Sequence, residues 1–232
     1  MNQFCSKVLS CGHYLPRKCL TNADLEKTLD TSDEWITQRT GIKQRYIAEG
    51  SDETTAQMAY NAAKQALEIA GIAPNHVDMI ILATSTPDHA FPASAAKVQA
   101  LLKAENAFAF DVQAACSGFI YALSTADQFI KTGAVKTVLV IGSERMSSLV
   151  NWNDRTTAIL FGDGAGAYVL QAAPYEHAQG ILSTHLFSNG KQYESLYVDA
   201  HETTRGVKMD GKLIYKQAIL KIGEAVTAAL KA

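Results

Sequence analysis

Three short runs of apolar and β-branched residues, separated by alanine-rich stretches, dominate the middle of the chain. Residues 78–84, 107–112 and 136–141 are short and apolar enough to be strands buried on both faces of a sheet. The stretches between them predict helices at 93–104 and 117–132. Strands that alternate with helices in this way indicate an α/β fold with a largely parallel central sheet.

The clearest helix in the pattern covers residues 54–70, where apolar positions recur near helical spacing. Thr54 or Thr55 can cap its first turn, because a threonine hydroxyl accepts a hydrogen bond from a free backbone N–H. Gly71 follows the last apolar position and is expected to end the helix. Gly133 occupies the same place after a later helix, so a second glycine cap is expected there.

A glycine-rich segment at 162–167 has the letters of a dinucleotide-binding fingerprint. That fingerprint must open a helix, whereas these residues continue into an expected strand at 165–172. We therefore expect a tight turn with close backbone packing at this point, and no NAD site.

Beyond a polar break at 174–179 the chain begins a second structural unit. Residues 180–187 are expected to form a strand, 188–205 a polar loop and 212–231 a long helix. No strand follows this helix in the sequence to complete another crossover, so the second unit is expected to be unfinished.

The composition narrows the class of protein. Apolar residues make up 47% of the 232 positions, which is enough for a substantial core. The 21 Lys and Arg balance 23 Asp and Glu, so a broad basic surface for nucleic acid is not expected. No apolar run approaches the ~20 residues of a membrane helix, and residues 1–10 lack the layout of a secretory signal. We expect a cytoplasmic protein with neither nucleic-acid nor membrane partners.

The four cysteines are Cys5, Cys11, Cys19 and Cys116. They form no C-x-x-C pair and no histidine stands at zinc-finger spacing, so we expect reduced thiols and no metal site. The first three lie in an N-terminal strand-and-loop region with no helix expected after them. For these three a structural role is expected.

Cys116 lies where an expected strand gives way to an alanine-rich helix. A helix N-terminus carries partial positive charge, which stabilises a thiolate, and its free N–H groups can bind an oxyanion. Ala114, Ala115 and Gly118 are small and leave room for a substrate. The local sequence alone leaves the alternative of a buried cysteine that packs as a small apolar residue.

The stretch 31–46 opens with part of a capping box at Ser32, without the usual acidic or amide residue three positions later. Trp35 and Arg39 are spaced i, i+4 and are expected to share one helix face. Such a face can stack an adenine and pair with phosphate. The alternative is an ordinary solvent-facing helix.

Five segments, in order along the chain, closely resemble the β-ketoacyl-acyl carrier protein synthase III family; they are 30–48, 83–95, 109–123, 153–167 and 209–216. The resemblance implies a thiolase-like αβαβα layered α/β fold that works as a homodimer. Residues 1–173 match the N-terminal thiolase-like half, which carries the cysteine. Residues 174–232 match only the beginning of the C-terminal half, so the resemblance implies a complete first half and a truncated second half.

The resemblance also implies a reaction. The cysteine at the position of Cys116 takes an acyl group from acyl-coenzyme A, with acetyl-coenzyme A the expected primer. Malonyl-acyl carrier protein then loses carbon dioxide and attacks the thioester, which starts a fatty acid. Such chemistry needs a thiolate and donors for an oxyanion and an enolate, and it needs no metal or organic cofactor because acyl-coenzyme A is a substrate.

Roles for further residues follow only from their positions in the matching segments. The residues that match coenzyme A contacts or the tunnel wall are Thr31, Trp35, Arg39, Arg155, Met209 and Gly211. Phe91 matches the aromatic residue given across the dimer to the acyl pocket, and Leu160 and Phe161 match nearby lining positions. For the apolar ones, core packing is the competing interpretation.

The family's catalytic histidine and asparagine would align beyond Ala232. None of the six histidines matches that histidine's motif; they are His13, His76, His89, His177, His185 and His201. Two alternatives therefore remain open. One is a related acyl-coenzyme A condensing enzyme with another acceptor, and the other is a shortened, non-catalytic homologue that binds coenzyme A or dimerises.

Overall fold

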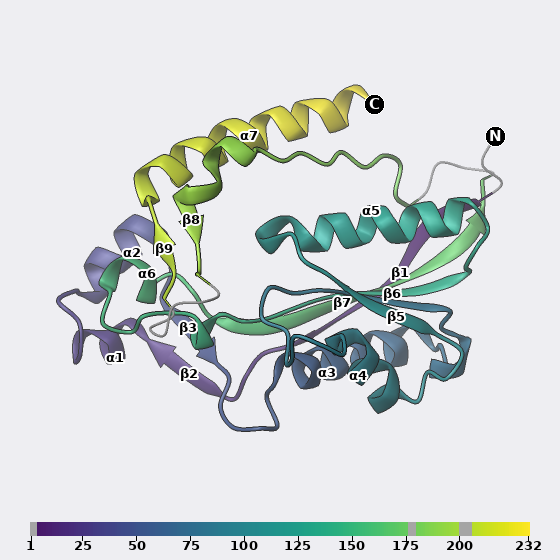
Figure 1. The fold of residues 1–232 in the computed structure, drawn as a ribbon, viewed down its shortest axis with the longest axis horizontal. Helices are drawn as coiled ribbons and strands as arrows, with labels where there is room; N and C mark the ends of the chain where they lie inside the picture. The colour runs from purple at the N-terminus through teal and green to yellow at the C-terminus, as the bar shows by residue number, and fades with distance from the viewer. Residues whose placement is uncertain (1–3, 176–179, 200–205) are drawn as a thin grey trace. The chain divides into compact units, whose positions relative to one another are not determined.

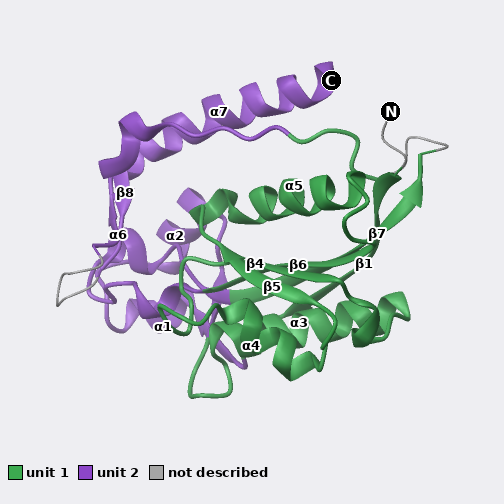
Figure 2. Ribbon diagram, turned by 45° about the vertical axis from the view of Figure 1, so that its right-hand side comes forward, with its two compact units in different colours: residues 1–16, 48–144, 164–184 green, residues 17–47, 145–163, 185–232 purple. Residues whose placement is uncertain are grey.

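The computed structural model describes residues 4–175, 180–199 and 206–232. The chain forms two compact units (Figure 2). Unit 1 consists of residues 1–16, 48–144 and 164–184, and unit 2 of residues 17–47, 145–163 and 185–232. The units therefore interleave along the chain, whereas the two halves implied by the family resemblance, 1–173 and 174–232, are consecutive.

Unit 1 is built on one five-stranded sheet with the strand order β1-β7-β6-β4-β5. Strand β4 runs parallel to β5 and to β6, while β1 pairs with β7 in the antiparallel sense. The strands are β1 (Phe4–Tyr14), β4 (Met79–Ala83), β5 (Phe108–Val112), β6 (Thr137–Arg145) and β7 (Asp163–Pro174). The three strands expected in the middle of the chain are confirmed, with shifts of a few residues at their ends.

Helices cover both faces of this sheet (Figure 1). One face packs against α3 (Thr55–Ala70) and α4 (Ser94–Leu102), and the other against α5 (Gly118–Lys131). Alternate residues of β4 enter the two cores. Ile80 and Leu82 lie in the core with α3, and Met79 and Ile81 in the core with α5, all fully buried. This alternation explains why the strand is apolar at every position.

The helix ends follow local rules. The Thr54 hydroxyl accepts a hydrogen bond from Gln57 N, and Gly71 ends α3 with φ of 67°. Gly133 has φ of 75° and follows Thr132, the residue that closes α5. The left-handed position after α4 is taken by Lys103, which no glycine signal in the sequence could have indicated.

Unit 2 has a smaller core, in which Leu25, Ile36, Ala158 and Ile159 are buried. Strands β2 (Lys18–Thr21) and β3 (Gln44–Ile47) pair antiparallel, as do β8 (Leu196–Tyr197) and β9 (Lys208–Met209). Its helices are α1 (Asn22–Glu26), α2 (Asp33–Thr40), α6 (Arg155–Ala158) and α7 (Gly211–Lys231), the last confirming the expected long helix. The remaining elements are short 3-10 turns at Pro74–His76, Ala115–Ser117, Met146–Ser148 and Gly190–Ser195.

The expected turn at 162–167 is wrong, because Asp163 already begins β7. Ala165 and Gly166 pair with Tyr14 and His13 of β1, so the glycines lie within a strand. The expected close packing is present. A Cβ at Gly164 would lie 3.3 Å from Tyr14 O, and strand pairing with a glycine needs no turn.

Three other expectations also need correction. Residues 181–187 have strand-like composition but form no strand, since no described strand pairs with them; their contacts include a hydrogen bond from Ile181 N to Ser6 O. The expected loop at 188–205 contains a 3-10 turn and β8, and residues 200–205 lie outside the described part. In addition, α1 begins three residues after Cys19, where no helix was expected.

No helix in the described part of the chain combines the length and apolar character needed to cross a membrane.

Gly12 of β1 lies very close to the backbone of α3, which predicts a large effect of adding a methyl group there. A Cβ at Gly12 would lie 2.6 Å from Ala66 N in α3, and neither backbone can move aside. We expect Gly12→Ala to lower the free energy of unfolding by about 1–3 kcal/mol, measured by urea denaturation. Gly166→Ala, on the neighbouring strand, is the control because its Cβ would meet nothing closer than 3.9 Å. Equal stability of the two variants would contradict this packing.

Candidate active site

Cys116 lies in the 3-10 turn Ala115–Ser117, between the end of β5 and the first residue of α5. Ser117 N donates to Ala114 O to close this turn, and Ala115 has a left-handed φ of 46°. A non-glycine residue in that conformation costs ~1–3 kcal/mol and is common at functional sites. The Cys116 side chain is exposed, so the alternative of a buried, packing cysteine is excluded for this position.

The other cysteines differ from one another. Cys5 is buried, as expected for a structural residue, but Cys11 and Cys19 are exposed. Exposure therefore does not separate Cys116 from these two thiols. What separates it is its place before α5 and the cavity beside it.

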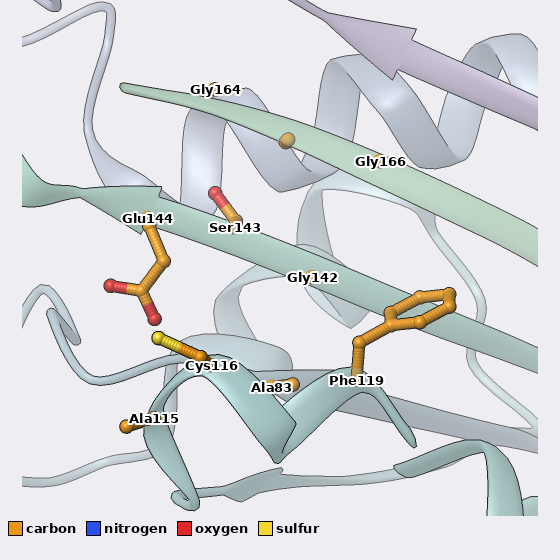
Figure 3. A pocket seen from close by; sticks show the side chains of 10 residues that line it. Ala83, Ala115, Cys116, Phe119, Gly142, Ser143, Glu144, Gly164 and Gly166 are labelled. Atoms are coloured by element: carbon orange, nitrogen blue, oxygen red, sulfur yellow. The ribbon is translucent and has the colours of Figure 1, made fainter. Parts of the chain in front are cut away.

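That cavity has a volume of about 330 Å³ and opens beside the Cys116 side chain (Figure 3). Most of its wall consists of glycine and alanine, which leave the space that larger side chains would fill. It is lined by Ala83, Ala115, Cys116, Phe119, Gly142, Ser143, Glu144, Gly164, Ala165 and Gly166. All ten residues belong to unit 1.

Two glycines allow α5 to lie close to the sheet at this point. A Cβ at Gly118 would lie 3.2 Å from Ala83 Cβ of β4, and a Cβ at Gly142 of β6 would lie 3.2 Å from the Phe119 ring. Phe119 in turn packs edge-on against Tyr168, with ring centroids 5.3 Å apart. The first turn of α5 is therefore held against β4 and β6, which places Cys116 at the edge of the cavity.

Glu144 is the polar residue of this cavity that the sequence did not single out. Its carboxylate accepts hydrogen bonds from Ser85 N at 2.6 Å and from Thr86 Oγ1 at 3.0 Å. Figure 3 shows this carboxylate and the Cys116 sulfur directed toward the same space. The available signal was position, because ligands of α/β sheets bind beyond the carboxyl ends of the strands and Glu144 is near the end of β6.

A second group of predicted residues comes together in unit 2. Trp35 lies in the first turn of α2, and the Arg39 guanidinium carbon is 4.3 Å from the centre of its indole ring. The guanidinium carbon of Arg155, the first residue of α6, is 5.4 Å from the same ring. Arg155 Nη1 also donates to Asp30 O at 2.6 Å. We call Trp35, Arg39 and Arg155 the arginine–tryptophan cluster.

A buried hydroxyl without a hydrogen-bond partner in the described part of the chain lies just before α2, the helix that carries Trp35 and Arg39. Thr31 Oγ1 is buried and has no hydrogen-bond partner among the residues described. Thr31 precedes Ser32, whose hydroxyl caps α2 by accepting from Trp35 N at 3.1 Å, as the partial capping box predicted. A buried oxygen without a partner costs free energy, and a bound polar ligand can supply the missing hydrogen bond.

The remaining predicted residues have diverse positions. Met209 ends β9 and Gly211 begins α7, and a Cβ at Gly211 would lie 3.5 Å from Met209 Cε. Leu160 and Phe161 pack, partly buried, against the core of unit 2, which agrees with the competing interpretation of core packing. Phe91, between β4 and α4 in unit 1, is 86% exposed.

No group of three or more His, Cys, Asp or Glu side chains suited to a metal ion occurs among residues 4–175, 180–199 and 206–232. The described groups offer an exposed thiol beside a small cavity in unit 1, and a cationic and aromatic surface in unit 2.

Comparison with known proteins shows which family the chain resembles. Residues 110–190 match the family model described as 3-Oxoacyl-[acyl-carrier-protein (ACP)] synthase III. Over 98% of its length the chain is 51% identical to a beta-ketoacyl-[acyl-carrier-protein] synthase III from Paramagnetospirillum magneticum, of which it covers 72%.

Solved structures agree with the sequence match. The 3-oxoacyl-[acyl-carrier-protein] synthase III from Aquifex aeolicus is 51% identical, with a TM-score of 0.85 over 91% of this chain and 66% of that one. The corresponding protein from Pseudomonas aeruginosa is 39% identical, with a TM-score of 0.92 over 98% of this chain and 70% of that one. The sequence thus spans roughly two thirds to three quarters of the length of these relatives. By identity, coverage and fold, the chain belongs to the β-ketoacyl-[acyl-carrier-protein] synthase III family.

Proposed function

We propose that Cys116 accepts an acyl group from acyl-coenzyme A, as the first half of a condensation with malonyl-acyl carrier protein. The observation that carries the proposal is an exposed thiol at the N-terminal end of α5, beside a cavity of about 330 Å³, in a chain of this family. A cavity of this size has room for a short acyl group such as acetyl.

The acyl transfer is a thioester exchange. The Cys116 thiolate attacks the carbonyl carbon of the acyl thioester, and the electron pair moves onto the oxygen. When that oxyanion collapses, the bond from the carbonyl carbon to the coenzyme A sulfur breaks. Coenzyme A leaves as a thiolate and takes up the proton that Cys116 released. The N-terminal end of α5 favours both the attacking thiolate and the oxyanion.

The arginine–tryptophan cluster suits the nucleotide end of coenzyme A. An indole face stacks on an adenine, and two guanidinium groups pair with phosphates through charge-assisted hydrogen bonds. The unpartnered hydroxyl of Thr31 adds a hydrogen-bonding group at the start of the same helix. Met209 and Gly211 are proposed as tunnel-wall residues, because they match those positions in the family.

Further parts of the proposal rest on the family alone. The acyl group on Cys116 would condense with malonyl-acyl carrier protein to start a fatty acid in the cytoplasm. The protein would act as a homodimer, with the exposed Phe91 reaching the partner's acyl pocket and with Leu160 and Phe161 near it. Residues 1–173 and 174–232 would correspond to the family's two thiolase-like halves.

Acylation should occur on Cys116 and not on the other exposed thiols. Incubation with radiolabelled acetyl-coenzyme A, followed by peptide mapping, should place the label on the peptide that contains Cys116. Cys116→Ser should lose this label, because a serine hydroxyl is not ionised near neutral pH. Cys11→Ser is the matched control, since Cys11 is also exposed. Label on Cys11 or Cys19 would overturn the assignment.

Arg155 should contribute to the binding of coenzyme A. Loss of a charge-assisted hydrogen bond in Arg155→Ala should weaken binding by about 1.5–3 kcal/mol, or about 10- to 150-fold in Kd, measured by calorimetry. Lys27→Ala, which removes an exposed cation paired with Asp24 elsewhere in unit 2, should leave Kd within experimental error. If the alanine variants of Trp35, Arg39 and Arg155 all bind as the parent does, the cluster is not the nucleotide site.

Residues 1–232 should acylate Cys116 without completing the condensation. No histidine or asparagine among them matches the family's catalytic pair, and each missing donor for the enolate typically costs ~10²–10³ in rate. Release of carbon dioxide from malonyl-acyl carrier protein should therefore be negligible beside that of the Paramagnetospirillum magneticum relative. Comparable rates would show that residues 1–232 themselves supply these donors.

A further inference from the structure

Unit 2 contains a buried arginine that the proposed chemistry does not use. Arg45 of β3 is only 5% exposed. Its guanidinium donates to Asn22 Oδ1 at 2.9 Å, to Ile159 O at 2.9 Å and to Leu20 O at 3.3 Å. Burial lowers the pKa of Arg45, yet a guanidinium keeps its charge at any physiological pH. The three hydrogen bonds therefore offset a real desolvation cost.

One arm of this arginine reaches α6. Ile159, whose carbonyl it binds, is the residue that closes α6, and Arg155 is the first residue of the same short helix. A helix of four residues has one turn, so its two ends cannot shift independently. The contact with Ile159 O therefore constrains the backbone that carries Arg155.

The other arm reaches α2 through Asn22. This asparagine is fully buried, and its amide donates to Asp33 Oδ1 at 2.8 Å and to Ile42 O at 2.8 Å. Asp33 is the first residue of α2, and Trp35 is in the same turn. A bond to Asp33 thus constrains the turn from which the indole projects.

The two helices are joined through one guanidinium and one amide. Both ribbon views place α2 beside α6 (Figures 1 and 2), and the Arg155 guanidinium carbon lies 5.4 Å from the Trp35 ring. A side chain with one donor direction could bind one helix only, whereas the planar fork of Arg45 binds both Asn22 and Ile159.

We propose that Arg45, acting through Asn22 and Asp33, is a positioning residue that sets the spacing of Trp35 and Arg155 for the nucleotide end of acyl-coenzyme A. This inference rests on the proposed nucleotide role of the arginine–tryptophan cluster. Its physical content is preorganisation: groups held at their binding distance need not be ordered when the ligand arrives. Arg45 itself is buried and touches no substrate.

The test compares two acyl donors, acetyl-coenzyme A and S-acetyl-N-acetylcysteamine, which has the thioester but no nucleotide. Asp33→Ala removes the acceptor at the exposed end of the network, and Asp33→Asn restores an oxygen acceptor without the charge. Glu34→Ala is the matched control, because Glu34 is the other acidic residue of this turn and bonds to Gln38 outside the network. Arg45→Lys keeps the buried charge and loses the fork.

Asp33→Ala and Arg45→Lys should raise the half-saturating concentration of acetyl-coenzyme A in Cys116 acylation by about 2- to 30-fold. The maximal rate, and the rate with S-acetyl-N-acetylcysteamine, should stay within about twofold of the parent. Asp33→Asn should recover most of the loss, and Glu34→Ala should behave as the parent. Calorimetric binding of coenzyme A should rank the variants in the same order.

Two results would overturn the inference: parent-like behaviour of both Asp33→Ala and Arg45→Lys, or an equal loss with both donors, which would indicate general damage to the fold. Trp35→Ala shows whether a negative result concerns the role of Arg45 alone or the proposed nucleotide site as a whole. If Trp35→Ala impairs the use of acetyl-coenzyme A alone while the network variants do not, only the role of Arg45 falls. If Trp35→Ala does not discriminate between the donors, the proposed nucleotide site falls and the role of Arg45 with it.

Discussion

The close packing of α5 on the carboxyl ends of β4 and β6 is the constraint on which the candidate site depends. Gly118 and Gly142 remove the two methyl groups that would hold the helix away, at 3.2 Å from Ala83 and from Phe119. Because β4 is buried on both faces, its carboxyl end cannot move without disturbing two cores at once. The turn that carries Cys116 therefore has a rigid foundation, and the cavity beside it is bounded by backbone as well as by side chains.

Unit 2 depends less on apolar packing than unit 1 does. Its core is small and its helices α1, α2 and α6 are short, so apolar burial supplies less of the order. Buried polar groups take part instead. Arg45 and Asn22 connect three segments by directional hydrogen bonds, which specify one arrangement more sharply than apolar contact does. The arginine–tryptophan cluster is a product of that arrangement.

The two candidate regions offer different chemistry: unit 1 has an exposed thiol with a small cavity, and unit 2 has cations over an indole. A thioester with a nucleotide tail has the same two parts, a reactive carbonyl at one end and phosphates with an adenine at the other. Membership of the family, established by 51% identity over nearly the whole chain, supports the proposed roles of both regions.

The sequence by itself determined many of the features that depend on near neighbours along the chain. The apolar pattern predicts β4, β5, β6 and most of β7, and helical spacing predicts α3, α5 and α7. The Trp35–Arg39 contact follows from i, i+4 spacing, and Cys116 was correctly placed between a strand and a helix. The tertiary structure decided the rest. Arg155 reaches Trp35 across 120 positions, and Glu144 faces the Cys116 cavity only because β6 ends there. A strand needs a partner for its N–H and C=O groups, and the whole fold sets the position of that partner. Residues 165–167 find a partner in β1 and join the sheet, whereas residues 181–187 have no described strand beside them and remain outside it.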